Sequence, residues 1–156
     1  MHLNMSTKTF NSNDLNKEFW LPRAYKEAKL IYENKNTRGY NVKTGKPRTF
    51  SEVKETTEFG HAPECWLLEQ EDFTDDKRRY KDLMYKNIPV EIKTVTHKKN
   101  IDAMLQKCAE FKKEIDFNGE KNWRQFPDYV LMFIGNWYTR NYTFYKIYKW
   151  NGSEFI

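Results

Sequence analysis

The chain has 156 residues, a formal net charge of +5 at pH 7, three histidines and two cysteines. This length fits one domain, residues 1–156, that is large enough to bury a substantial core. The sequence lacks an apolar run of about 18 residues for a membrane span and the apolar core of a signal peptide, while Cys65 and Cys108 lack zinc-site spacing. We therefore expect a cytoplasmic protein, of bacterial or viral type from its Lys, Asn, Tyr and Phe bias, whose positive charge favours a polyanionic partner.

The N-terminal part of the chain is polar and then becomes helical. Residues 1–13 are expected to be loose. Apolar residues then recur at helical spacing, which predicts a helix from Pro22 to about Glu33, because a proline ring suits the first helical position.

Residues 34–51 form a basic segment without any acidic residue, and glycines and a proline within it predict a loop. Its basic side chains, of which Lys43, Lys46 and Arg48 lie closest together, could follow a phosphate backbone. A solvated connector with no ligand is an equally good interpretation.

A second helical region begins near Ser51, which we expect to be its N-cap with Glu52 in the first turn. Gly60 and Pro63 are expected to interrupt this helix. The acidic run that follows, residues 69–76, is typical of a solvated loop.

A β-hairpin is predicted next, with strands at Tyr80 to Tyr85 and Ile88 to Val95 and a turn between them. Because side chains alternate between faces along a strand, Glu91 and Lys93 lie on the same face, roughly 7 Å apart. Asp82 on the partner strand can be brought close to both. Two carboxylates bind a hard divalent cation through oxygen, and a nearby ammonium can position or deprotonate a water molecule. This combination suits hydrolysis of a phosphodiester.

The last part of the chain predicts one helix and two strands. The helix runs from Asn100 to about Asp116 and should cross over the sheet before a parallel strand. A continuous apolar run at 128–138 is typical of a strand buried on both faces, and a further strand follows at 142–150. We expect a mixed α/β (α+β) fold with a central sheet of about four to five strands flanked by helices.

The hairpin and its flanking elements resemble the active site of the PD-(D/E)xK nuclease superfamily. Asp82, nine residues, then Glu91-Ile92-Lys93 is similar to the superfamily's Asp…Glu-x-Lys signature, with Lys81 in place of the frequent proline. The order of helix, hairpin, helix and two strands over about residues 50 to 150 also resembles this restriction-endonuclease-like core.

The resemblance implies a Mg²⁺-dependent nuclease, most simply a DNA endonuclease, in which Mn²⁺ would substitute. Asp82 and Glu91 would hold the metal with the carbonyl of Ile92, and Lys93 would orient or activate the attacking water. A helix before the hairpin often adds a carboxylate in this superfamily, and Glu64 is the first candidate.

Several alternatives stay open at this point. Glu58 is second to Glu64, an ordinary exposed glutamate is as good an interpretation of either, and Asp75 or Asp76 could replace Asp82. His61 and His97 are further candidates, although isolated histidines near loops are more often surface residues. DNA is favoured over RNA as partner, and a homodimer is open.

A different class of function also fits the sequence. A non-catalytic nucleic-acid- or protein-binding module would use the basic surface together with exposed aromatic residues for stacking, such as Trp137, Tyr138, Tyr142 and Tyr145. A purely structural protein is the third interpretation.

Overall fold

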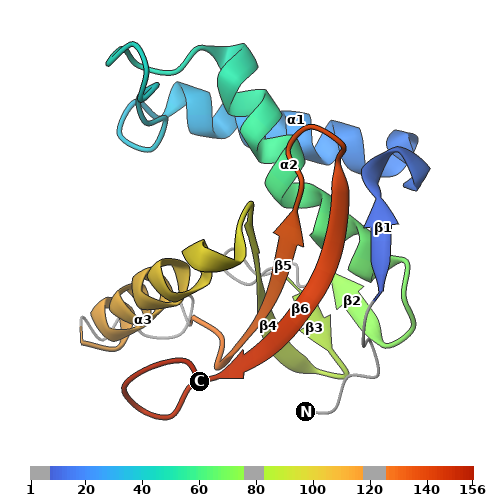
Figure 1. The fold of residues 1–156 in the computed structure, drawn as a ribbon, viewed down its shortest axis with the longest axis vertical. Coiled ribbons are helices and arrows are strands. Elements are labelled where there is room, and N and C mark those ends of the chain that lie inside the picture. Colours follow the sequence, from blue (N-terminus) through green and yellow to red (C-terminus); the bar gives the residue numbers. More distant parts are fainter. Residues whose placement is uncertain (1–7, 76–82, 118–125) are drawn as a thin grey trace.

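A computed structural model describes residues 8–75, 83–117 and 126–156, and it has a mixed α+β fold (Figure 1). Within these ranges, three α-helices accompany a six-stranded sheet, and two single 3₁₀ turns occupy Ser12–Asp14 and Lys98–Asn100. The elements in chain order are β1 (Thr9–Asn11), α1 (Lys17–Glu33), α2 (Phe50–Leu68), β2 (Phe73–Asp75), β3 (Leu83–Tyr85), β4 (Ile88–Val95), α3 (Ile101–Phe117), β5 (Tyr129–Gly135) and β6 (Asn141–Lys149). The mixed fold class is thus confirmed, while the sheet is wider than the four to five strands expected.

The sheet has the strand order β1-β6-β5-β4-β3-β2. Its one parallel pair among the described strands is β4 with β5, and all other neighbours are antiparallel. Helix α3 connects the parallel pair, since a parallel connection needs a crossover of this length. The crossover helix predicted from the sequence is therefore confirmed.

Helices cover both faces of the sheet. Alternate residues of β5 enter two different apolar clusters, Leu131 and Phe133 in one and Val130 and Met132 in the other. The first cluster includes side chains of α1 and α2, and the second includes side chains of α3. This explains why the β5 segment is apolar at every position rather than at alternate ones.

The N-terminal segment is more ordered than its polar composition suggested. Residues 9–11 form β1, which pairs with β6 from Thr9 opposite Thr143 to Asn11 opposite Asn141. The expectation of a loose segment at 1–13 is therefore wrong for these residues, because the edge of β6 supplies backbone partners that the sequence does not reveal. Residues 1–7 lie outside the described part.

Helix α1 begins before Pro22 and not at it. Asn16 is the N-cap, and its side chain accepts a hydrogen bond from the backbone N–H of Glu18. Pro22 therefore sits inside the helix, where it removes the hydrogen bond to the carbonyl of Glu18. Buried contacts of Trp20 and Ala24 keep this segment in place.

Helix α2 is continuous through both residues that were expected to break it. Thr49, not Ser51, is the N-cap, and the helix passes through Gly60 and Pro63. Pro63 has no N–H for the carbonyl of Phe59, four residues earlier. The hydroxyl of Tyr142 on β6 donates to that carbonyl at 2.8 Å instead. A tertiary hydrogen bond thus replaces the one that proline removes, and the helix continues.

The described part of the hairpin agrees with the sequence prediction. Strand β4 has the expected bounds, and β3 pairs with it from Leu83 opposite Val90 to Tyr85 opposite Ile88. Both turn residues, Lys86 and Asn87, have positive φ angles of 44° and 68°. Positive φ at both central positions is the mark of a type I′ turn, whose backbone twist matches that of the paired strands.

Candidate functional site

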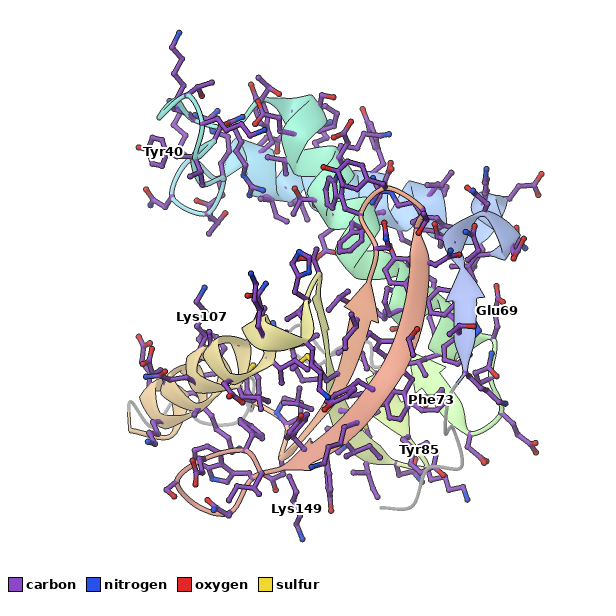
Figure 2. The ribbon with its side chains drawn as sticks, viewed as in Figure 1. Tyr40, Glu69, Phe73, Tyr85, Lys107 and Lys149 are labelled. Carbon is purple, nitrogen blue, oxygen red and sulfur yellow. The ribbon has the colours of Figure 1, made fainter. Side chains whose placement is uncertain are left out.

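A cavity of about 430 Å³ lies where α1, α2 and the loop between them meet β4. Its lining contains acidic and basic side chains from all four segments: Glu27, Arg48, His61, Glu64, Glu91 and Lys93. Figure 2 shows the side chains around this part of the sheet. The sequence prediction placed only some of these residues together.

Strand β4 supplies the two residues of the Glu-x-Lys pattern. Glu91 is buried, with 8% of its surface exposed, and Lys93 is half-buried. The Nζ atom of Lys93 lies 3.4 Å from Oε1 of Glu91, so the two form an ion pair. The strand alternation that predicted their shared face therefore also places their charges in contact.

The predicted partner carboxylate, Asp82, lies outside the described residues. The residue that follows it, Leu83, is paired with Val90, the residue before Glu91. Asp76, one alternative to Asp82, is also outside the described part. The other alternative, Asp75, forms an ion pair with Arg23 at 3.1 Å and is not among the cavity residues.

Helix α2 brings a second carboxylate to the cavity. Glu64 lies three residues after His61, so the two side chains are neighbours on one helix face. Oε2 of Glu64 lies 3.2 Å from Nδ1 of His61, and Oε1 lies 3.9 Å from Arg23. Glu27 of α1 approaches the same imidazole nitrogen at 3.5 Å. Glu58, the second candidate, instead pairs with Lys54 at 2.7 Å and is not among the cavity residues.

His61 carries positive charge in this environment. Burial by itself would lower the pKa of His61, but hydrogen bonds to Cys65 and Glu64 and the negative charge of Glu64 outweigh it and raise the pKa to about 10. Its Nε2 atom is buried and has no hydrogen-bond partner among the residues described. The hydroxyl of Thr94, which also lines the cavity, is likewise buried and has no hydrogen-bond partner among the described residues. Buried polar atoms are almost always satisfied, so these two atoms are exceptions, and both belong to residues that line this cavity.

The basic residues predicted to bind nucleic acid divide into two groups. Arg48 lies in the cavity lining, and its guanidinium donates to the carbonyl of Arg38 and to the hydroxyl of Thr56. Lys43 and Lys46 are exposed on the loop and do not line the cavity. His97 is exposed and lies elsewhere.

Sequence reasoning missed Glu27 and two threonines of α2, Thr56 and Thr57, which also line the cavity. Glu27 lies beside the apolar stripe of α1, with Ala24 and Ala28 fully buried. A glutamate at that position has no local signal that separates it from an ordinary exposed helix residue. Only the packing of α1 against α2 directs it to His61.

The donor set of the cavity can be compared with what a divalent cation needs. The carboxylates of Glu64 and Glu91 and the carbonyl of Ile92 are oxygen donors of the kind that Mg²⁺ prefers. Across residues 8–75, 83–117 and 126–156, no group of three or more His, Cys, Asp or Glu side chains is placed to hold a metal ion. The described donors therefore fit a hard cation in type but are incomplete in number.

None of the helices that the structure describes has the length and apolar character needed to cross a bilayer. Comparisons of the chain with protein-family models, with characterised proteins and with solved structures return no match.

Proposed function

We propose that this protein is a Mg²⁺-dependent nuclease that hydrolyses phosphodiester bonds in DNA at the cavity between α2 and β4. One observation carries the proposal: Glu64 of α2 lines one cavity together with Glu91 and Lys93 of β4. Carboxylate oxygens are the ligands that a hard divalent cation prefers, and an ammonium beside them can position a water molecule.

The topology supports the same conclusion. A helix, three antiparallel strands, a crossover helix and a strand parallel to the third follow one another from α2 to β5. The resemblance to the PD-(D/E)xK superfamily implies the order helix, hairpin, helix and two strands, which α2, β3 with β4, α3, β5 and β6 follow, and β2 is an additional strand before the hairpin. The Glu-x-Lys residues lie on the strand that belongs to both the antiparallel and the parallel part of the sheet.

Each residue of the site has a proposed role. Glu91, Asp82 and Glu64 hold Mg²⁺ through oxygen, with the carbonyl of Ile92, and Mn²⁺ is expected to substitute. A cation held there would offset phosphate charge and lower the pKa of a coordinated water. Lys93 positions the attacking water and offsets charge on the scissile phosphate, since its Nζ already lies 3.4 Å from Glu91.

The residues around the carboxylates keep Glu64 in place. His61 and Arg23 both contact its carboxylate, at 3.2 Å and 3.9 Å. Each oxygen of this carboxylate faces one cation, and the two contacts together restrict the rotamers of Glu64. We therefore expect His61 to position Glu64 and not to touch the scissile phosphate.

Cleavage of a supercoiled plasmid tests the proposal. The purified protein should nick the plasmid in Mg²⁺ or Mn²⁺ and not in EDTA. Glu91→Gln should lower the rate by at least about a hundredfold, because it removes a metal ligand. Glu55→Gln is the matched control, since Glu55 is an exposed residue of α2 outside the cavity. Wild-type cleavage by Glu91→Gln, with the fold checked by circular dichroism, would refute the assignment.

Lys93 is tested separately. An arginine keeps the positive charge but is wider, and it stays protonated at all relevant pH values. Lys93→Arg and Lys93→Ala should therefore both lose most of the cleavage rate while still binding DNA. Cleavage by Lys93→Arg within a few-fold of the wild type would mean that Lys93 acts only as a charge.

Binding without cleavage would favour the alternative, a non-catalytic nucleic-acid-binding module. The charge contribution of the loop can be measured from the salt dependence of the DNA-binding constant K. Replacing Lys43 and Lys46 with Ala should reduce the slope of log K against log salt by roughly 0.9 for each phosphate of duplex DNA that these lysines neutralise in the wild type. An unchanged slope would mean that these lysines do not contact phosphates and that the loop is only a solvated connector.

A further inference from the structure

The segment between α1 and α2, residues 34–49, is a preorganised loop that we call the α1–α2 loop. Tyr40 and Pro47 form an isolated β-bridge across it. The N–H of Asn41 donates to the carbonyl of Lys46, and the N–H of Gly45 to the carbonyl of Asn41, both at 2.8 Å. Figure 1 shows the loop projecting past the ends of α1 and α2, away from the sheet.

The side chain of Asn41 fixes the tip of this loop. Its Oδ1 accepts from the N–H groups of Lys43 at 2.9 Å and Thr44 at 3.3 Å. Its Nδ2 donates to Glu52 of α2 at 2.8 Å, and this hydrogen bond lowers the pKa of Glu52 from its usual value. The tip is therefore held in one conformation and anchored to the helix.

Apolar side chains are displayed at this tip. The neighbours of Asn41 on either side, Tyr40 and Val42, are 68% and 98% exposed. Figure 2 shows Tyr40 at the outer side of the loop. A rigid loop that holds a valine fully in solvent gains nothing from it in the isolated molecule. The surface of Val42 is therefore available to a partner.

The charge around the tip identifies the class of partner. Lys43 and Lys46 follow Val42 in the chain and are exposed, and residues 34–51 contain no acidic residue. A partner must therefore combine a negative exterior with an apolar interior that a small side chain can enter. Duplex DNA has this combination, with phosphates outside and stacked bases inside.

The loop is also continuous with the candidate active site. Arg48, at its C-terminal end, lines the cavity that contains Glu91 and Lys93. A DNA strand whose phosphate occupies that cavity would lie beside the C-terminal end of the α1–α2 loop. The same DNA would contact both sites.

We propose that Val42 is a wedge that enters a base step of the bound DNA, and that Tyr40 packs on a base that the wedge uncovers. This inference rests on the proposed nuclease function for its ligand. Apolar wedges cost unstacking energy, which is smallest at mismatched or damaged positions. The protein should consequently prefer duplexes that contain a weakened base step.

Fluorescence anisotropy in EDTA separates the wedge from cleavage. The wild-type protein should bind a duplex with a central mismatch roughly tenfold more tightly than the matched duplex, which corresponds to about 1.4 kcal/mol. Val42→Ala should remove this preference, whereas Val42→Leu should keep it. Tyr40→Ala should weaken binding about five- to one-hundredfold, the range for loss of one stacked base. Lys35→Ala, a charge change elsewhere in the loop, should affect both duplexes equally.

A duplex containing 2-aminopurine reports the unstacking directly. Its fluorescence should rise when the wild-type protein binds and should rise much less with Val42→Ala. An equal rise with both proteins would overturn the wedge, and plasmid cleavage would still decide the nuclease proposal separately. If Val42→Ala instead changes the sedimentation of the free protein without changing the fluorescence, the tip is a contact between copies and the wedge is refuted. Failure to bind either duplex would also overturn the wedge, and the nuclease proposal would still be decided by plasmid cleavage in Mg²⁺.

Discussion

Tyr142→Phe tests how α2 keeps its shape through Pro63. The hydroxyl of Tyr142 is buried and donates to the carbonyl of Phe59 at 2.8 Å. Removing it leaves that carbonyl with no donor, because Pro63 cannot supply one. A buried backbone group without a partner costs about 1–3 kcal/mol, so the free energy of unfolding should fall by that amount. In a domain of this size the melting temperature should fall by about 2–4 °C per kcal/mol.

A double-mutant cycle isolates the proposed cause. Pro63→Ala restores an N–H that can donate to the carbonyl of Phe59, which can accept two hydrogen bonds. Tyr142→Phe should therefore cost less in the Pro63→Ala background than in the wild type, by about 1 kcal/mol. Urea unfolding followed by circular dichroism measures all four free energies. Strictly additive effects would refute the explanation for the continuous helix.

Tyr142 should also make the stability of the fold sensitive to alkali. Burial raises the pKa of Tyr142 from 10.0 to about 12, against an opposing effect of Arg140. Because the folded state binds this proton more tightly than the unfolded state, its contribution to stability is complete below pH 10 and is lost between pH 10 and about 12. The loss should amount to about 2–3 kcal/mol. Tyr142→Phe should flatten this part of the stability profile, whereas Tyr138→Phe, which changes a residue 92% exposed, should not.

Two further substitutions test the packing on either face of the sheet. Gly135→Ala should lower the free energy of unfolding by about 1–3 kcal/mol in urea titrations, because a Cβ there would lie 2.8 Å from the buried ring of Phe59. Lys112→Met should cost about 1–3 kcal/mol by the same measurement, because the buried ammonium donates to the carbonyl of Phe126 at 2.8 Å.

Each of these substitutions has a matched control. Gly60→Ala meets no atom within 4 Å and should stabilise α2 by about 0.5–1 kcal/mol. Asp128→Asn removes the ion pair with Lys112 at 3.0 Å, but Asp128 is 65% exposed and the change should be at most about 1 kcal/mol. A neutral effect of Gly135→Ala, or an Asp128→Asn effect as large as that of Lys112→Met, would contradict this account.

Local sequence determined the elements whose signal lies within a few residues. The bounds of β4 followed from a β-branched run after Lys86 and Asn87, and the apolar run of β5 predicted a strand buried on both faces. The shared face of Glu91 and Lys93 followed from alternation alone. The part of the candidate site that β4 supplies could therefore be predicted before any tertiary contact was known.

Tertiary structure decided the features that depend on residues far apart in the chain. Helix α2 continues through Pro63 because the hydroxyl of Tyr142 on β6 donates a hydrogen bond to the carbonyl of Phe59. Residues 9–11 become a strand because β6 offers an edge for pairing. Local propensity is weak enough for one buried hydrogen bond or one strand partner to override it. The approach of Glu27 to His61 has the same origin, since it needs the packing of α1 on α2. The contact between His61 and Glu64, by contrast, follows from their spacing of three residues within α2.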